Sequence, residues 1–163
     1  MRELPVRKRI RLDEYDYSNA GAYFVTICTK DKHEFLGEIV GDVPLRVPQC
    51  ILSHHGLAVD AQIQSISRVY PDVLIDNYVI MPNHIHMIVT MESGTRRGTS
   101  PTKVTIPQIV QSLKSMITKR FGFSIWQRSY HDHIIRNEEE YKRISQYIDE
   151  NPLRWTEDCY YTK

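Results

Sequence analysis

The stretch VLIDNYVIMPNHIHMIVTM, residues 73–91, decides the fold. It contains two apolar runs that are rich in β-branched residues, and the turn-forming pair Pro82-Asn83 lies between them. The pattern therefore predicts an antiparallel hairpin whose strands are residues 73–81 and 84–91.

On both sides of this hairpin the sequence alternates between strand-like and helix-like segments. Further strands are predicted at residues 22–29 and, roughly, at 125–135, and a short hairpin is predicted within 33–50. Helices are predicted at 54–69, at 106–121 and from the N-cap Asn137 to Asn151-Pro152. The order is strand, helix, strand, strand, helix, strand, helix. It predicts an α+β fold, a ferredoxin-like or RRM-like split βαβ sandwich with an antiparallel sheet and an extra C-terminal helix.

Helical spacing also predicts which residues face the core. The inward positions are Leu57, Ala61, Ile63 or Gln64, Ile66 and Val69 in the first helix, and Ile109, Val110, Leu113, Met116 and Ile117 in the second.

The composition is that of one ordinary globular domain spanning residues 1–163. Hydrophobic residues make up 41% and charged residues 25%, and no run of about 18 apolar residues could span a bilayer. The basic start is followed by no apolar stretch, so we expect a cytoplasmic protein that does not contact membranes. The three cysteines are odd in number and widely spaced, and we expect them to be reduced.

The net charge of +1 hides two basic segments. The first is an N-terminal arm, residues 1–16. The second comprises residues 92–105, a Gly-, Ser-, Thr- and Arg-rich stretch predicted to be a flexible loop, and the helix that follows it. Both segments could follow phosphate groups, or they could be a solvated surface and a frayed terminus.

His84 and His86 lie two residues apart on a predicted strand, so both point to one face while Ile85 points to the other. Two imidazoles on one face can share a metal ion, but they can also be two hydrogen-bonded histidines at a strand end. A second pair, His131 and His133, lies in the last predicted strand. In a ferredoxin-like sheet these two strands flank the first strand, so one ion held by all four histidines is not expected.

The last predicted helix places Tyr147 and Asn151 four residues apart. They lie at the edge of an apolar stripe formed by Tyr141, Ile144 and Ile148. Both edge residues can therefore face a cleft. The alternative is that Tyr147 is only a boundary residue of an amphipathic helix.

MPNHIHMIV at 81–89, followed by WQRSYHDHIIRNEEEYKRISQYIDENPLRW at 126–155, resembles the HUH-type single-tyrosine transposases. The resemblance is closest to the subgroup associated with repetitive extragenic palindromes (REP) in bacteria. YSNAGAYFVTICT at 17–29 fits the first strand of that family. The likeness covers most of the chain, and the ordered combination of motifs is specific.

This resemblance implies that His84 and His86 are the metal-binding pair, that Tyr147 is the nucleophile and that Asn151 offers its amide to the metal. The ion would be Mg²⁺ or Mn²⁺, which can polarise a scissile phosphate. The expected partner is single-stranded or hairpin DNA, nicked and rejoined by a transposase through a 5′-phosphotyrosine. No nucleotide cofactor is expected, since no phosphate-binding glycine loop is present.

Contacts to DNA phosphates are expected from the two basic segments, and contacts to bases from aromatic side chains. The residues expected to take part are Arg7, Lys8, Arg9, Arg11, Arg96, Arg97, Lys114, Lys119, Tyr130 and His133. For His133 a hydrogen-bonded structural role is the alternative. One complete site in each chain suits a monomer, and a homodimer is also compatible with the sequence.

Two other functions are compatible with parts of the sequence. A nucleic-acid-binding module without catalysis fits the fold class, although no RNP-type aromatic motif is present. A zinc-dependent phosphoesterase could use the four histidines, but it leaves Tyr147 without a role.

Overall fold

The computed structural model describes residues 19–41, 47–93 and 104–161. Its centre is a four-stranded antiparallel sheet in the order β4-β5-β1-β6, formed by β1 (Gly21–Cys28), β4 (Val73–Met81), β5 (His84–Met91) and β6 (His131–Ile135). The α-helices are α1 (His54–Val69), α2 (Ile106–Phe121) and α3 (Glu138–Glu150), and two 3-10 helices are η1 (Lys30–Lys32) and η2 (Asn151–Glu157). The α+β class, the antiparallel sheet and the extra C-terminal helix are confirmed.

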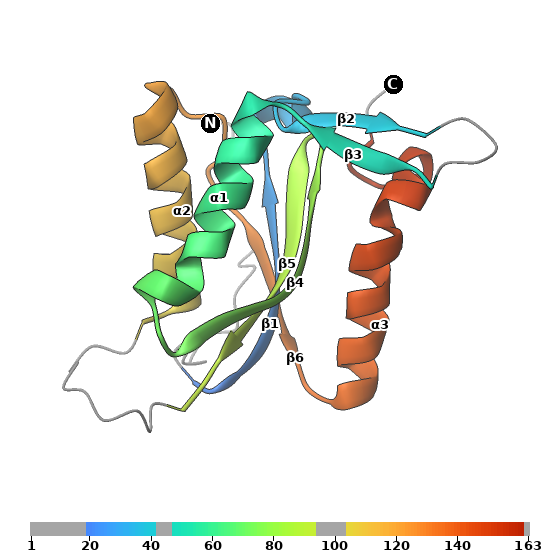
Figure 1. Cartoon of the computed structure of the whole chain (residues 1–163). Helices are drawn as coiled ribbons and strands as arrows, with labels where there is room; N and C mark the ends of the chain where they lie inside the picture. The colour runs from blue at the N-terminus through green and yellow to red at the C-terminus, as the bar shows by residue number, and fades with distance from the viewer. Residues whose placement is uncertain (1–18, 42–46, 94–103, 162–163) are drawn as a thin grey trace, which may run out of the picture.

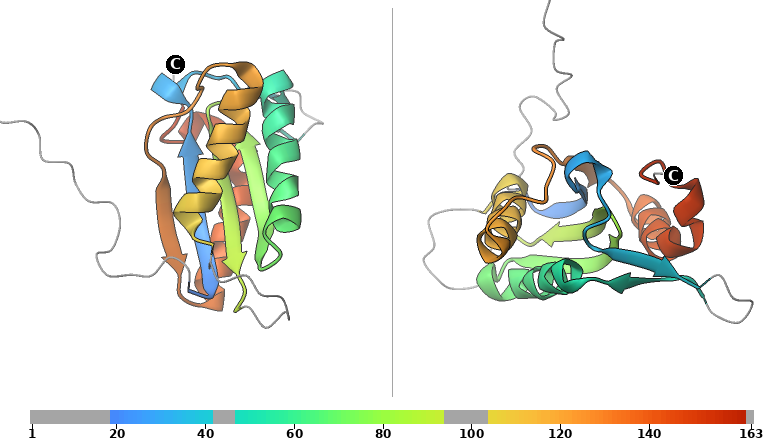
Figure 2. Two further views of the ribbon diagram at one scale, coloured as in Figure 1. Left: turned by 90° about the vertical axis from the view of Figure 1, so that its left-hand side faces the viewer. Right: turned by 90° about the horizontal axis from the view of Figure 1, so that it is seen from above.

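The helices cover the two faces of the sheet unequally (Figure 1). α1 and α2 lie side by side on one face, and α3 lies on the other (Figure 2). The hydrophobic core is formed under α1 and α2, where β1 contributes Val25 and Ile27 and β5 contributes Ile85, Met87 and Val89. Because side chains alternate along a strand, the residues between these positions face α3.

Local sequence determines where the helices begin and end. Ser53 caps α1 and Asn137 caps α3, each accepting a hydrogen bond from a backbone N–H in the first turn. Thr105 and Gln108 form a capping box at the start of α2. Gly122 ends α2 in the left-handed conformation, with φ of 77°.

The inward face of α2 is confirmed for Ile109, Val110, Leu113 and Ile117, whereas that of α1 differs more from the prediction. Leu57, Ala61, Gln64, Val69 and Met116 are exposed. Ile63 and Ile66 are buried as predicted, and the other buried residues of α1 are Gly56, Ala58 and Val59. A Cβ on Gly56 would overlap the carbonyl oxygen of Leu36, so the backbone of α1 at Gly56 packs directly against the backbone at Leu36. Helical spacing alone does not reveal this close approach.

The last strand is shorter than predicted, because β6 begins only at His131. Before it, Trp126 forms a single bridge with Thr29. The carbonyl oxygens of Gln127 and Ser129 accept hydrogen bonds from the Nζ of Lys114 in α2, at 2.9 and 3.1 Å. The segment is therefore held both by α2 and by a single strand-type bridge, at which Gln127 N–H also donates to the carbonyl oxygen of Cys28, and a continuous ladder with β1 starts only at β6.

The hairpin expected within 33–50 is formed by β2 (Gly37–Val40) and β3 (Gln49–Leu52) and ends slightly later than predicted. The N-terminal arm, residues 1–16, and most of the loop predicted at 92–105 lie outside the described residues. No described helix is both long and apolar enough to cross a membrane. The three cysteines are free, as their spacing predicts.

Candidate active site

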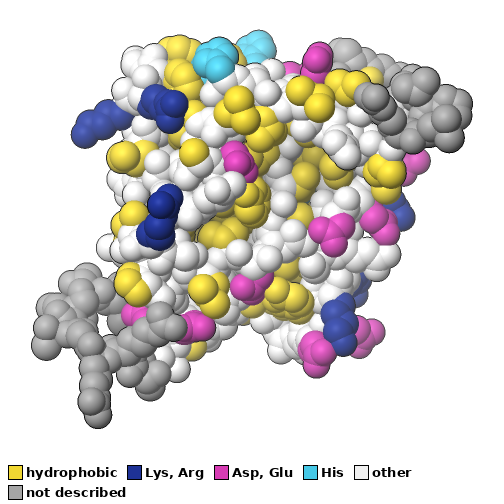
Figure 3. All heavy atoms as spheres, in the orientation of Figure 1, with side chains coloured by type: hydrophobic (Ala, Val, Ile, Leu, Met, Phe, Trp, Pro, Cys, Tyr) yellow, Lys and Arg dark blue, Asp and Glu magenta, His cyan; other side chains and the backbone are white. Residues whose placement is uncertain are grey.

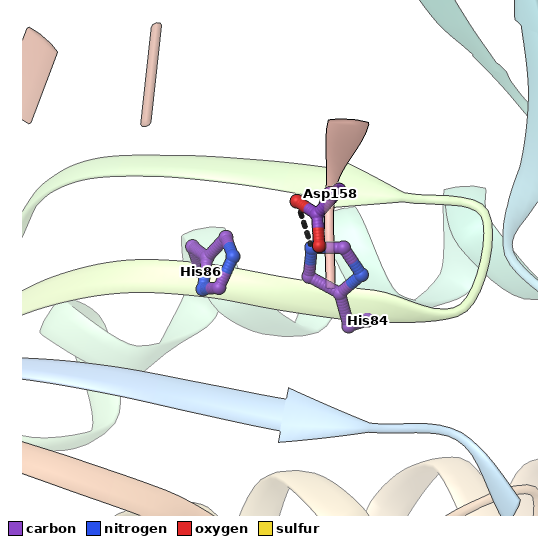
Figure 4. Close-up of side chains that lie close together, drawn as sticks. All are labelled: His84, His86 and Asp158. Carbon is purple, nitrogen blue, oxygen red and sulfur yellow. Dashed lines mark ion pairs between the residues drawn. The ribbon is translucent and has the colours of Figure 1, made fainter. Parts of the chain in front are cut away.

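β5 places His84 and His86 side by side on the face of the sheet that α3 covers (Figure 4). The two residues are only 0% and 2% exposed, and their ring centroids lie 4.5 Å apart. Ile85 and Met87 point the other way into the core. The alternation predicted from the sequence is confirmed.

Hydrogen bonds fix the orientation of the His84 ring. The Nδ2 of Asn83 donates to the carbonyl oxygens of Lys32 and Tyr160, at 3.2 and 2.8 Å, and its Oδ1 faces the Nδ1 of His84 at 2.9 Å. Because this Oδ1 can only accept, the Nδ1 of His84 carries the proton and Nε2 keeps its lone pair. That Nε2 is buried and has no hydrogen-bond partner among the described residues.

The His86 ring is held from β1. Its Nδ1 lies 2.8 Å from the Oγ1 of Thr26, and the ring stacks on Phe24 with centroids 5.2 Å apart. A histidine that binds a metal through one nitrogen commonly has the other nitrogen hydrogen-bonded in this way. Thr26 and Asn83 therefore occupy the positions of residues that orient metal-binding imidazoles.

Burial lowers the pKa of both histidines. For His84 the pKa falls to about 4, although the carboxylate of Asp158 and the amide of Asn151 act in the opposite direction. The pKa of His86 lies well below its usual value because of burial and, secondly, because of the neighbouring His84. Both rings are therefore neutral near pH 7, and each keeps a lone pair on one nitrogen.

A carboxylate that the sequence analysis did not identify completes this cluster. Asp158 follows η2, and one of its oxygens lies 3.9 Å from the Nε2 of His84 (Figure 4). The ligand atoms that His84, His86 and Asp158 offer all lie within 4.8 Å of one another. No local spacing marks Asp158, because only the path of η2 brings it back to the start of β5.

Asn151 lies beside the same cluster, directly after α3. Its side chain is buried, with the residue only 2% exposed. Its Nδ2 donates to the carboxylate of Asp158 at 3.0 Å. Its Oδ1 is buried and has no hydrogen-bond partner among the described residues.

Tyr147 lies one helical turn before Asn151, at the mouth of the cluster. Its hydroxyl oxygen is 3.4 Å from the Nε2 of His86, and the residue is 41% exposed. Partial burial and, secondly, the charge of Asp158 raise the pKa of the phenol, so the hydroxyl keeps its proton at neutral pH. The structure thus brings the tyrosine, the histidine pair and Asn151 together.

The donor set of this cluster fits a divalent cation. The Nε2 of His84 and the Oδ1 of Asn151 are buried acceptors without a donor among the described residues, and the carboxylate of Asp158 adds a negative charge beside them. Acceptors packed together in a buried site are unfavourable unless a proton or a cation lies between them. Neutral imidazoles with carboxylate and amide oxygens are ligands that divalent metals accept.

The second histidine pair lies apart from this cluster. β6, which carries it, is separated from β5 by β1, as the sequence predicts. His131 is exposed, and the Nε2 of His133 lies at hydrogen-bonding distance, 2.7 Å, from a carboxylate oxygen of Glu140. The group of described residues that could hold a metal ion includes neither of them.

The other residues expected to contact DNA fall into two groups. Six of them lie outside the described residues, namely Arg7, Lys8, Arg9, Arg11, Arg96 and Arg97. Lys114, Lys119 and Tyr130 line a cavity beside α2, on the side of the sheet away from α3. None of these three residues lies in the cluster around Tyr147.

Comparison with known proteins bears on family and fold. No family model matches the chain. An uncharacterized protein of Haemophilus influenzae is 35% identical over an alignment of 173 positions, gaps included, which covers 95% of this chain and 93% of the relative. The structure of a REP-associated tyrosine transposase bound to a REP hairpin has a TM-score of 0.63 at 22% identity and covers 88% of this chain and 74% of that chain. The fold that the sequence resemblance implies is therefore confirmed.

Proposed function

We propose that this chain, which belongs to the same family as the Haemophilus influenzae protein and has the fold of a REP-associated tyrosine transposase, is a metal-dependent DNA strand-transferase. The observation that carries the proposal is the position of Tyr147. Its hydroxyl lies 3.4 Å from a buried imidazole, at the mouth of a cluster in which the Nε2 of His84 and the Oδ1 of Asn151 have no donor among the described residues. A tyrosine that served only to pack α3 against the sheet would not need a buried imidazole and unpaired acceptors beside its hydroxyl.

The reaction is an exchange of one phosphodiester for another. The hydroxyl oxygen of Tyr147 attacks phosphorus and forms a 5′-phosphotyrosine, while the bond from phosphorus to the 3′ oxygen breaks and leaves a 3′-hydroxyl. The phenol proton passes to solvent as the new bond forms, because the side chain is partly exposed, and the departing 3′ oxygen takes up a proton from solvent. Since the bond energy is conserved, a new 3′-hydroxyl can reverse the step and join another strand.

His84, His86, Asp158 and Asn151 would hold the ion, expected to be Mg²⁺ or Mn²⁺. When bound, such an ion acts as a Lewis acid on the scissile phosphate. The residues of the chain provide orientation, because Thr26 and Asn83 fix the two imidazoles and α3 fixes the phenol. Asp158 would be an anionic ligand that the sequence resemblance does not include.

The substrate proposed here is DNA that carries a hairpin with an unpaired flank. The related solved structure is a transposase bound to a REP hairpin, and this supports the choice. An unpaired strand suits the site because the backbone must approach a phenol at the mouth of a buried cluster.

The test is the capture of the covalent intermediate. The protein is incubated with labelled DNA hairpins whose single-stranded flanks are randomised, with Mn²⁺, Mg²⁺ or EDTA, and adducts are separated on a denaturing gel and sequenced. We expect an adduct that needs the metal and is absent in Tyr147→Phe. Tyr141→Phe is the matched control, because that phenol is on the same helix but contacts Asp76.

Two results would contradict the proposal. A non-catalytic binding module would retain the hairpin without any covalent adduct. An adduct that persists in Tyr147→Phe but disappears in Tyr160→Phe would move the nucleophile to Tyr160, whose ring lies 4.5 Å from that of His84.

A further inference from the structure

A second site candidate lies on the opposite side of the sheet from Tyr147. A cavity of about 710 Å³ runs between the outer face of α2 and the segment 124–130. Three cations line it, namely Lys114, Lys119 and Arg128, and none of the lining residues is acidic. Figure 3 shows Lys and Arg side chains over α2, on the left of that view.

The positive charge of Lys114 is built into the floor of this cavity. Its Nζ donates to the carbonyl oxygens of Gln127 and Ser129, and it lies 5.9 Å from the ring centroid of Tyr130. Burial lowers the pKa of this lysine, yet no described carboxylate forms an ion pair with it. A half-buried cation without a counter-charge favours the binding of an anion.

The cations of α3 and η2 differ from those of the cavity. Lys142 pairs with Glu138 at 2.7 Å, and Arg154 pairs with Glu150 at 2.9 Å. Lys119 and Arg128 form no such pair with a described residue. The α2 side of the molecule therefore carries positive charge that no described carboxylate neutralises by an ion pair.

Polar side chains complete the cavity. Gln111, Ser115, Thr118 and Ser124 line it together with the three cations. Hydroxyl and amide groups next to lysine and arginine are the usual donors to phosphate oxygens of DNA. The lining thus offers both charge and hydrogen bonds to a phosphodiester backbone.

We propose that this cavity binds backbone phosphates of the paired stem of a DNA hairpin. The identification of the anion as DNA rests on the proposed function. The stem is the part that fits, because the strand to be cleaved must lie unpaired at Tyr147 on the other face of the sheet. One protein molecule would then hold the stem from the α2 side and the unpaired flank from the α3 side.

The test is the salt dependence of hairpin binding. Fluorescence anisotropy measures the Kd of a labelled DNA hairpin with a single-stranded flank, in EDTA to prevent cleavage, over a series of NaCl concentrations. The test variant is Lys119→Ala/Arg128→Ala, which leaves the structural contacts of Lys114 intact. The control is Arg68→Ala/Arg120→Ala, which removes the same charge from exposed positions that do not line the cavity.

For two lost phosphate contacts we expect the slope of log Kd against log salt concentration to fall by about 2, and binding at low salt to weaken about tenfold. The control variant should keep both values. A flank-only oligonucleotide should bind the test variant and the wild type equally well. An unchanged slope, or an equal loss for the flank-only oligonucleotide, overturns the stem assignment.

The assay for the covalent adduct shows which of the two proposals fails, the stem site or the proposed catalytic function. If the wild type forms no adduct but the cavity variant loses hairpin affinity, the stem site stands without the catalytic function. If the adduct forms and the cavity variant binds the hairpin like the wild type, the stem site is wrong and the catalytic function stands.

Discussion

The two faces of the sheet are held by different forces. On the α1 and α2 face, apolar side chains interlock, and Leu113 and Ile117 of α2 are buried against the strands. On the α3 face, only Ile148 of the thirteen residues of the helix is buried. There Asn77 of β4 lies within 2.9 Å of the Ser145 hydroxyl and of Asp149, and Tyr141 donates to Asp76.

This difference separates stability from chemistry. Apolar burial contributes most of the free energy of folding, about 25 cal/mol per Å², so the α1 and α2 face holds the fold together. The α3 face carries polar groups that are positioned rather than packed, including the histidine pair and Tyr147. Changes on the second face should therefore affect activity more than stability.

The largest effect on stability should come from the apolar face. Leu113→Ala leaves a cavity in the core and should lower the free energy of unfolding by about 2–5 kcal/mol. Ile144→Ala, on the half-buried side of α3, should lower it by about 1 kcal/mol or less. Urea unfolding followed by circular dichroism measures both, and equal losses would contradict the distinction between the faces.

Metal binding should stabilise the polar face. At a Mn²⁺ concentration 100 times its Kd, the wild type should gain about 2.7 kcal/mol of unfolding free energy, and His84→Ala or Asp158→Ala should lose most of this gain. Thermal unfolding with and without Mn²⁺ measures the effect. His133→Ala is the control, because its imidazole is paired with Glu140 away from the cluster. If His133→Ala also abolished the gain, the ion would be bound elsewhere.

Acid should destabilise the protein through the buried imidazoles. The pKa of His84 is lowered to about 4 in the folded state, while the unfolded chain has a value near 6.5. The contribution of His84 to the free energy of unfolding is therefore present above pH 6.5 and is lost as the pH falls toward 4. This happens because the imidazole of the unfolded chain takes up a proton at a higher pH than that of the folded chain. The slope of the free energy of unfolding against pH should reach about 1.4 kcal/mol per pH unit for this histidine. His84→Gln should reduce the slope in urea titrations between pH 7 and 4.5, and an unreduced slope would contradict the assignment.

A small change in stability together with a measurable effect on activity should come from Asn77. Asn77→Ala removes hydrogen bonds that tie α3 to β4 and should cost about 1 kcal/mol. Loosened positioning of Tyr147 should slow adduct formation about tenfold or more, since small misplacements are costly in catalysis. Single-turnover adduct kinetics measure the rate, and Gln64→Ala, which removes a surface contact with Asp60, is the control.

Much of the fold and part of the site could be predicted because the relevant signals are local. The hairpin of β4 and β5, the helix caps and the same-face position of His84 and His86 follow from alternation and from turn and cap residues. Helical spacing predicted the burial of Ile63 and Ile66 in α1, but the burial of Gly56, Ala58 and Val59 could not be predicted in this way. It depends on the close approach of Gly56 to the carbonyl group of Leu36, a residue that lies outside α1 and that no helical spacing can indicate.

The sequence by itself determined the order of the elements and the period of each one, since these depend on neighbouring residues. It therefore determined that the two imidazoles share a face and that Tyr147 and Asn151 lie one helical turn apart. Only the tertiary structure decided that this turn reaches those imidazoles, that Asp158 returns to join them and that Lys114 ties the segment before β6 to α2. These contacts join residues that are distant in sequence, and their geometry is set by how the layers pack, which no local pattern encodes.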